Sequence, residues 1–109
     1  MAYDTELAER VRAIIGVRQG LTERKMFGGI AWMLHGNMAC GVLGDEVIVR
    51  LGVEDSARAL AEPDTRPFDM TGRPMRGFVV VGGQSIAQGG QLTGWVDAGA
   101  DYASSLPPK

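Results

Sequence analysis

The sequence has little of what catalytic and metal-binding sites are usually built from. Among its 109 residues there is one histidine, His35, and one cysteine, Cys40. A single cysteine cannot form an internal disulfide, so nothing indicates an oxidising compartment. No second thiol or imidazole is present to complete a zinc site or an activated nucleophile. We therefore predict a protein that is not an enzyme, with no catalytic residue, no metal and no cofactor.

Charge of one sign and long hydrophobic runs are also missing. Eleven basic and thirteen acidic residues give a net charge of −2, so the chain as a whole does not attract a phosphate backbone. No apolar run approaches the ~18 residues that a membrane span needs. The first twenty residues carry charges throughout, unlike a signal peptide. We expect a soluble, cytoplasmic protein with no membrane partner.

What the sequence does have is a clear succession of helix and strand patterns. Leu7, Val11 and Ile15 recur at the spacing of one helix face. Residues 25–51 have strand character and contain two turn signals, Gly36-Asn37 and Gly44-Asp45. Further expected elements are a helix over about Val53–Ala61, strands at Arg66–Met70 and Met75–Val81, and a helix from about Gln91 to before Pro107. This order, α-β-β-β-α-β-β-α, predicts one domain over residues 1–109. The expected class is α+β, a two-layer α/β sandwich whose antiparallel-rich five-stranded sheet has helices on one face.

Two-residue turns at both signals would fix the strand register. His35 would then pair with Met38, and Leu43 with Glu46. Alternation puts one set of side chains under the helices: Ala31, Met33, His35, Met38, Cys40, Val42, Val47, Val49 and Leu51. The other set would form an open face: Ile30, Trp32, Leu34, Ala39, Gly41, Leu43, Glu46, Ile48 and Arg50. A face that is both apolar and charged is typical of a binding surface, but a slip of one residue would exchange the two faces.

These patterns define a candidate interaction surface and two alternatives. The candidate residues are Lys25, Phe27, Gly28, Gly29, Trp32, Leu34, Ile48, Arg50 and Arg76. The expected partner is a protein, either a second copy of the chain or another molecule. Convergence of Arg24-Lys25, Arg50, Arg73 and Arg76 near Trp32 would instead make a nucleic-acid platform, which the negative net charge does not favour. The second alternative is a small-molecule pocket near Phe27-Gly28-Gly29.

Several motifs taken together resemble the N-terminal domain of the TfoX/Sxy family of competence regulators. They are Met26-Phe27-Gly28-Gly29 after a basic pair, His35-Gly36-Asn37-Met38, Val47-Ile48-Val49-Arg50, Arg73-Pro74-Met75-Arg76-Gly77-Phe78, Trp95-Val96 and Leu106-Pro107-Pro108-Lys109. The resemblance implies a two-layer α/β domain related to the secretion-chaperone-like fold. It also implies a role in transcriptional control of natural competence without established catalysis. Full-length regulators of this family carry a second, C-terminal domain, so we expect a stand-alone first domain here.

Overall fold

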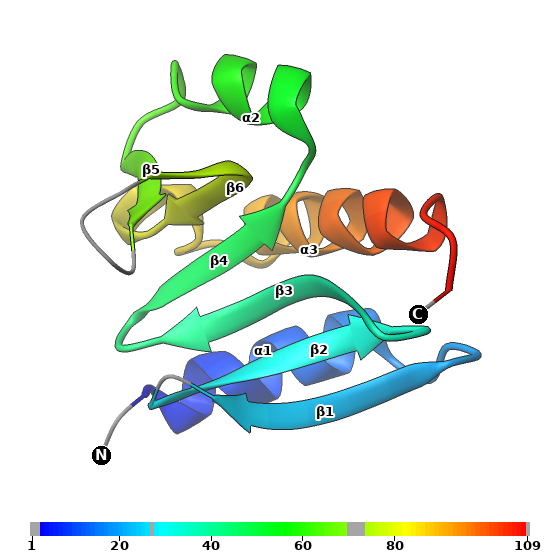
Figure 1. The fold of residues 1–109 in the computed structure, drawn as a ribbon. Helices are drawn as coiled ribbons and strands as arrows, with labels where there is room; N and C mark the ends of the chain where they lie inside the picture. Colours follow the sequence, from blue (N-terminus) through cyan, green and yellow to red (C-terminus); the bar gives the residue numbers. More distant parts are fainter. Residues whose placement is uncertain (1–2, 27, 70–73, 109) are drawn as a thin grey trace.

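The protein folds into two layers, a twisted antiparallel sheet and a pair of helices packed on one side of it (Figure 1). The computed structural model describes residues 3–26, 28–69 and 74–108. Its elements in chain order are α1 (Thr5–Ile15), β1 (Leu21–Met26), β2 (Gly29–Leu34), β3 (Asn37–Leu43), β4 (Glu46–Arg50), α2 (Val53–Ala59), β5 (Thr65–Asp69), β6 (Pro74–Val81), the short 3₁₀ helix η1 (Gly83–Ser85) and α3 (Gly89–Ser104). The predicted α+β class and two-layer arrangement are confirmed.

The sheet has one strand more than expected. In the described residues six strands lie in the order β1-β2-β3-β4-β6-β5, and every neighbouring pair is antiparallel. The strand missing from the prediction is the edge strand β1. Its sequence runs Leu-Thr-Glu-Arg-Lys-Met, and residues 22–25 are all exposed. It therefore lacks the apolar alternation by which a strand is recognised, and its charged side chains protect the sheet edge instead.

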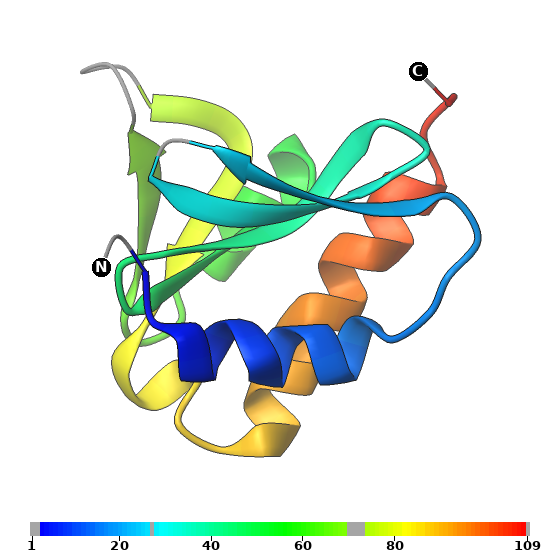
Figure 2. The same ribbon diagram turned by 90° about the horizontal axis from the view of Figure 1, so that it is seen from below.

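Helices α1 and α3 cover the same face of the sheet, as the view from below shows most clearly (Figure 2). The main core lies between these layers. Its fully buried side chains include Val11 and Ile15 of α1 and Leu92 and Val96 of α3. Each such side chain stabilises the fold by about 1.5–3 kcal/mol relative to an exposed position. Gly99 allows α3 to approach closely, because a Cβ there would lie 2.5 Å from the backbone oxygen of Ala39 in β3.

The second hairpin has the predicted register and the first does not. Leu43 pairs with Glu46 and Val42 with Val47, as expected. In the first hairpin, however, Leu34 pairs with Asn37, so the turn consists of His35 and Gly36. Both have positive φ, 51° and 85°, the conformation that a two-residue type I′ turn requires. Histidine tolerates this conformation better than most side chains, which is why the turn lies one residue earlier than the glycine-asparagine signal indicated.

A β-bulge then shifts the observed register of this hairpin by one residue. Met33 pairs with Met38 but Trp32 pairs with Cys40, which leaves Ala39 as the extra residue on β3. As a consequence Trp32 and Leu34, each 1% exposed, belong to the core under the helices. The expectation that Trp32 and Leu34 lie on the open face is therefore wrong. Ile30 and Ala39 also move into the core, while Met38 moves out of it.

The buried Trp32 is held by a charged pair at the edge of the sheet. Its Nε1 donates a hydrogen bond to Oε1 of Glu23, 3.0 Å away on β1. Arg12 of α1 donates two hydrogen bonds to the same carboxylate, from Nε at 2.8 Å and from Nη2 at 3.1 Å. These contacts lower the pKa of Glu23, with the Arg12 hydrogen bond as the main cause. The edge strand is thereby connected to both the helix layer and β2.

Helix α2 lies against β6, apart from the helix layer (Figure 1). Ser56 and Ala59 are buried, whereas the larger apolar side chains of Val53 and Leu60 are exposed. The small side chains of Ser56 and Ala59 allow this seven-residue helix to lie close to the strand. None of the helices within the described ranges is both long and apolar enough to cross a membrane.

Candidate functional site

The face of the sheet that α1 and α3 leave uncovered is the candidate site, and we call it the open face. One continuous row of directly paired residues crosses it from edge to edge: Arg24, Ala31, Gly41, Ile48, Val80 and Arg66. Directly opposed residues in antiparallel strands point to the same side. The row therefore has small and apolar side chains in its middle and an arginine at each end. Figure 1 is drawn with this face toward the viewer.

A second, smaller hydrophobic cluster occupies the open face. Ile48, Phe68 and Val80 form its buried centre, with exposures of 4%, 4% and 2%. Met38, Leu43 and Phe78 pack around them and remain partly exposed. Phe68 comes from the edge strand β5, where the register shifts between Pro67 and Asp69. Its ring centre lies 6.1 Å from that of Phe78, in a tilted aromatic contact.

Two adjoining hollows lie in the open face, and both are lined by Leu43, Ile48 and Phe68. The first lies over β2 and β3, above Ala31 and Gly41, and is shallow, with a volume of about 10 Å³. A Cβ on Gly41 would lie 3.2 Å from the Met38 methyl carbon and 2.9 Å from the Ile30 oxygen. The second hollow extends toward β5 and is rimmed by Glu46, Arg66 and Asp69. The open face is thus an apolar depression with a charged rim.

The rim carries three basic side chains, and only one of them has an acidic partner. Arg66 pairs with Glu46 at 2.5 Å. Arg50 instead places its guanidinium carbon 5.3 Å from the centre of the Phe78 ring and 5.8 Å from that of Tyr102 on α3. Within residues 3–26, 28–69 and 74–108, neither Arg24 nor Arg50 has a carboxylate at ion-pair distance. Two cations on this face are therefore available for a ligand.

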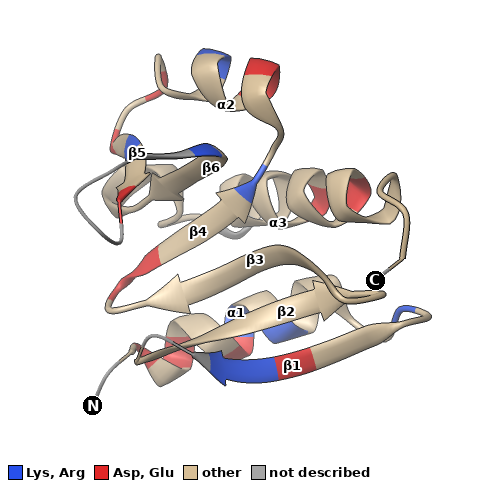
Figure 3. Ribbon diagram, viewed as in Figure 1, with Lys and Arg blue, Asp and Glu red and all other residues tan. Residues whose placement is uncertain are grey.

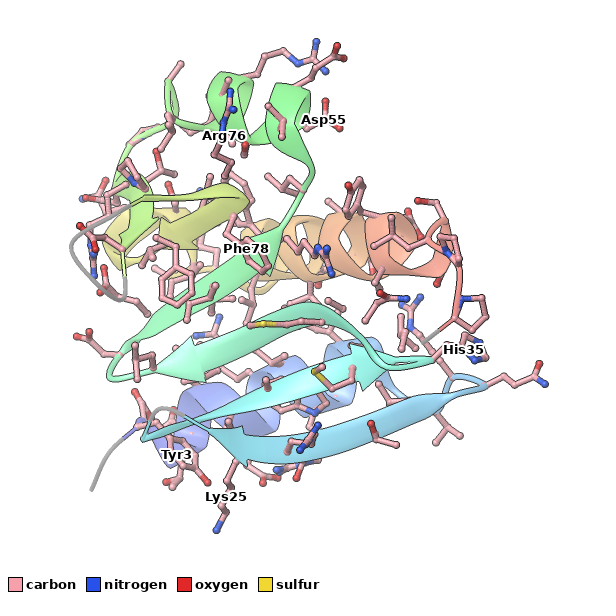
Figure 4. All side chains as sticks on the ribbon, viewed as in Figure 1. Tyr3, Lys25, His35, Asp55, Arg76 and Phe78 are labelled. Atoms are coloured by element: carbon pink, nitrogen blue, oxygen red, sulfur yellow. The ribbon has the colours of Figure 1, made fainter. Side chains whose placement is uncertain are left out.

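The residues singled out from the sequence are dispersed in the structure. Ile48 and Arg50 lie on the open face, whereas Trp32 and Leu34 are in the core. Lys25 pairs with the core residue Ile30 and so points to the other side of the sheet. Figure 4 shows Lys25 at the β1 edge and Arg76 beside α2, on opposite sides of the molecule.

The glycine segment borders the site at one of its described residues. Gly29 is buried and contributes backbone to the first hollow, and Gly28 is exposed beside it. Phe27 and Arg73 lie outside the described residues. The convergence of basic residues that a nucleic-acid platform would need is not seen among the described ones, which lie on β1, β4 and β6 (Figure 3). Arg24 and Lys25, adjacent in sequence, point to opposite sides of β1.

Five residues of the open-face cluster were not predicted as part of a site. Met38, assigned to the wrong face, depends on the bulge at Ala39, which no pattern in the sequence indicates. Leu43 was placed on the correct face but not selected. Phe68, Phe78 and Val80 belong to strands whose register neither turn signal determines. Their residue type was a signal in the sequence: Phe68 and Phe78 are two of the three phenylalanines in the chain, and both belong to the open-face cluster.

Cys40 and His35 are both packed against other parts of the fold. The Cys40 thiol is fully buried, and burial raises its pKa to about 12. The His35 ring lies against Gly20, where a Cβ would be 2.4 Å from ring atoms. In the part of the chain that the structure describes, no group of three or more His, Cys, Asp or Glu side chains is placed to hold a metal ion. Neither residue is arranged as a nucleophile or a ligand.

Fold and site together define a two-layer α+β domain with helices on one sheet face and an apolar, cation-rimmed depression on the other. The sequence matches the TfoX N-terminal domain over residues 15–103. The chain belongs to this family. No curated protein and no solved structure matches it significantly. The matched range covers every strand described above, all of α2 and all but the last residue of α3, whereas of α1 it includes only Ile15.

Proposed function

We propose that this chain is a non-enzymatic regulatory module that acts by binding another protein on the open face of its sheet. One observation carries the proposal. Three apolar side chains, Met38, Leu43 and Phe78, lie partly exposed around a hydrophobic cluster that neither α1 nor α3 covers. Removing such surface from water is favourable by roughly 25 cal/mol per Å², and contiguous apolar patches of this kind mark interaction sites.

The proposed role in regulation is supported by the family to which the chain belongs. Its resemblance to competence regulators suggests that binding serves transcriptional control, in the cytoplasm. A direct contact with nucleic acid is less well supported, because the free cations flank an apolar depression and no row of exposed aromatic side chains accompanies them in the described residues. Catalysis has the least support, since Cys40 is buried and His35 packs against a glycine.

The test compares capture of proteins from an extract of the native host by three forms of the chain. Leu43→Glu places a charge in the depression, and Leu60→Glu places the same charge at the end of α2, where Leu60 is 40% exposed. Circular dichroism first establishes that all three forms are folded. A protein retained by the wild type and by Leu60→Glu but lost with Leu43→Glu is the expected result. Equal retention by Leu43→Glu, or loss with Leu60→Glu alone, would show that the open face is not the binding surface.

A further inference from the structure

The charges on the open face indicate what kind of partner fits it. In its described part this face has three basic side chains, Arg24, Arg50 and Arg66, and two acidic ones, Glu46 and Asp69. Since Arg66 and Glu46 pair with each other, Arg24 and Arg50 remain free on two sides of the apolar cluster. The sign of this surface is opposite to the net charge of −2 of the whole chain. Complementary charge selects partners and orients them.

A second copy of the chain is a poor occupant for this surface. Two open faces stacked on each other would bring together two surfaces that each carry more basic than acidic described side chains, which disfavours association. Pairing through sheet edges is also obstructed, since β1 exposes Glu23, Arg24 and Lys25 and β5 contains Pro67. The occupant is therefore a different molecule.

The setting of Arg50 favours a carboxylate as its ligand. The contacts with Phe78 and Tyr102 restrict the guanidinium, so less conformational freedom is lost when a ligand binds. The side chain is only half-buried, so its planar guanidinium can donate two parallel hydrogen bonds to a carboxylate. Next to it, the partly exposed side chains of Met38 and Leu43 offer an apolar surface against which an apolar side chain of a ligand can pack.

On these grounds we infer that the open face binds an acidic, amphipathic segment of a partner protein, in which an apolar anchor is flanked by two carboxylates. This inference rests on the proposed function. Arg24 on β1 and Arg50 on β4 are three strand spacings and two residues apart, or roughly 16 Å. An extended segment covers this span in about five residues and a helical one in about eleven. The apolar anchor lies between the two acidic residues and packs against Met38 and Leu43.

The experiment is a selection of 16-residue random peptides displayed on phage against the folded wild-type chain. The expected result is enrichment of peptides with an excess of Asp and Glu on both sides of an apolar residue. Enriched peptides are then synthesised, and their affinity is measured by fluorescence anisotropy. Arg24→Glu and Arg50→Glu should each weaken binding by about fivefold or more.

Lys25→Glu is the matched control, since it makes the same charge change on the adjacent residue of β1, which points to the other side. It should leave the affinity within about twofold, because a surface charge outside the contact contributes little. Equal effects of Lys25→Glu and Arg24→Glu would overturn the inference, as they would reflect net charge alone. Selection of neutral or basic peptides would also overturn the inference. If Leu43→Glu abolished their binding, the proposed function would remain in place. If no selected peptide lost affinity for Leu43→Glu, both this inference and the proposed function would be contradicted. If the wild-type chain were a dimer that Leu43→Glu converts to monomers, the occupant of the open face would be a second copy and not an acidic partner.

Discussion

The guanidinium of Arg50 lies over the ring of Phe78, with 5.3 Å between its central carbon and the ring centre. The two residues are also direct partners across β4 and β6. This contact places a positive charge beside the apolar cluster of the open face without neutralising it. The open face is therefore both hydrophobic and cationic at one point, and the functional proposals depend on that combination.

Trp32 is a core residue, and its replacement should affect stability first. Trp32→Ala should lower the free energy of unfolding by about 3–5 kcal/mol, and Trp32→Glu should prevent folding because it buries an unpaired charge. Trp32→Phe, which keeps an aromatic ring but loses the bond to Glu23, should cost less than Trp32→Ala. Urea unfolding followed by circular dichroism measures all three. A folded Trp32→Glu variant with wild-type stability would contradict the burial of this side chain.

Stability should depend on pH through Glu23. Arg12 lowers the pKa of this carboxylate in the folded state from its ordinary value of 4.5. The stabilisation is therefore fully present above that value and is lost as the pH falls through the depressed folded-state pKa. Glu23→Gln should thus be less stable than the wild type at pH 7, and the difference should shrink below pH 4.5. Glu54→Gln, on the exposed start of α2, is the control for the loss of one carboxylate from the chain. A difference between wild type and Glu23→Gln that stays constant down to about pH 2.5 would refute this linkage.

Cys40 should be unreactive in the folded protein. Its thiol is buried, and its pKa of about 12 leaves almost no thiolate at about pH 8. Labelling with iodoacetamide should be negligible under native conditions and complete in concentrated urea, as followed by mass spectrometry. Stoichiometric labelling of the folded chain within minutes would show that the site opens readily or that the thiol is accessible.

The C-terminal segment should depend on one buried amide. Asn37, at 2% exposure, donates a hydrogen bond from Nδ2 to the backbone oxygen of Pro107 at 2.9 Å. Asn37→Ala should therefore lower the free energy of unfolding by about 1–3 kcal/mol, the range for a broken buried hydrogen bond. Hydrogen exchange should rise at the amides of Ser105 and Leu106, while the amides of α1 stay protected. Unchanged exchange at the C-terminal segment would indicate that this bond does not hold it.

The sequence was sufficient for the class of fold and for the register of one of the two hairpins that it signalled. Gly44-Asp45 is a turn with one plausible register, and the pairing of Leu43 with Glu46 followed from it. The first hairpin could not be placed in the same way, because His35 adopts a left-handed conformation that glycine or asparagine would ordinarily take. The bulge lies at Ala39, whose backbone oxygen lies close to Gly99 of α3, a tertiary contact that local patterns do not contain. The one-residue bulge exchanged the faces of β2 relative to β3, and with them the predicted role of Trp32.

The sequence therefore predicted that one sheet face is left uncovered by helices, but it identified only some of the residues on that face. Ile48 and Arg50 follow from the second hairpin, which local signals specify. Phe68 and Phe78 depend on how β5 and β6 join the sheet, which is long-range information. Their joint presence with Arg50 is visible only once the strand order is known.

The most direct test of the central claim is photo-crosslinking in the native host, with p-benzoylphenylalanine introduced at position 43 or at position 17. Leu43 lines the depression of the open face, whereas Val17 is fully exposed in the loop between α1 and β1. The expected result is one discrete adduct from position 43, suppressed by an excess of the unlabelled wild-type chain, and none from position 17. An adduct from position 17 alone, or none from position 43 in cells that contain the folded protein, would contradict the assignment of the open face as the docking surface.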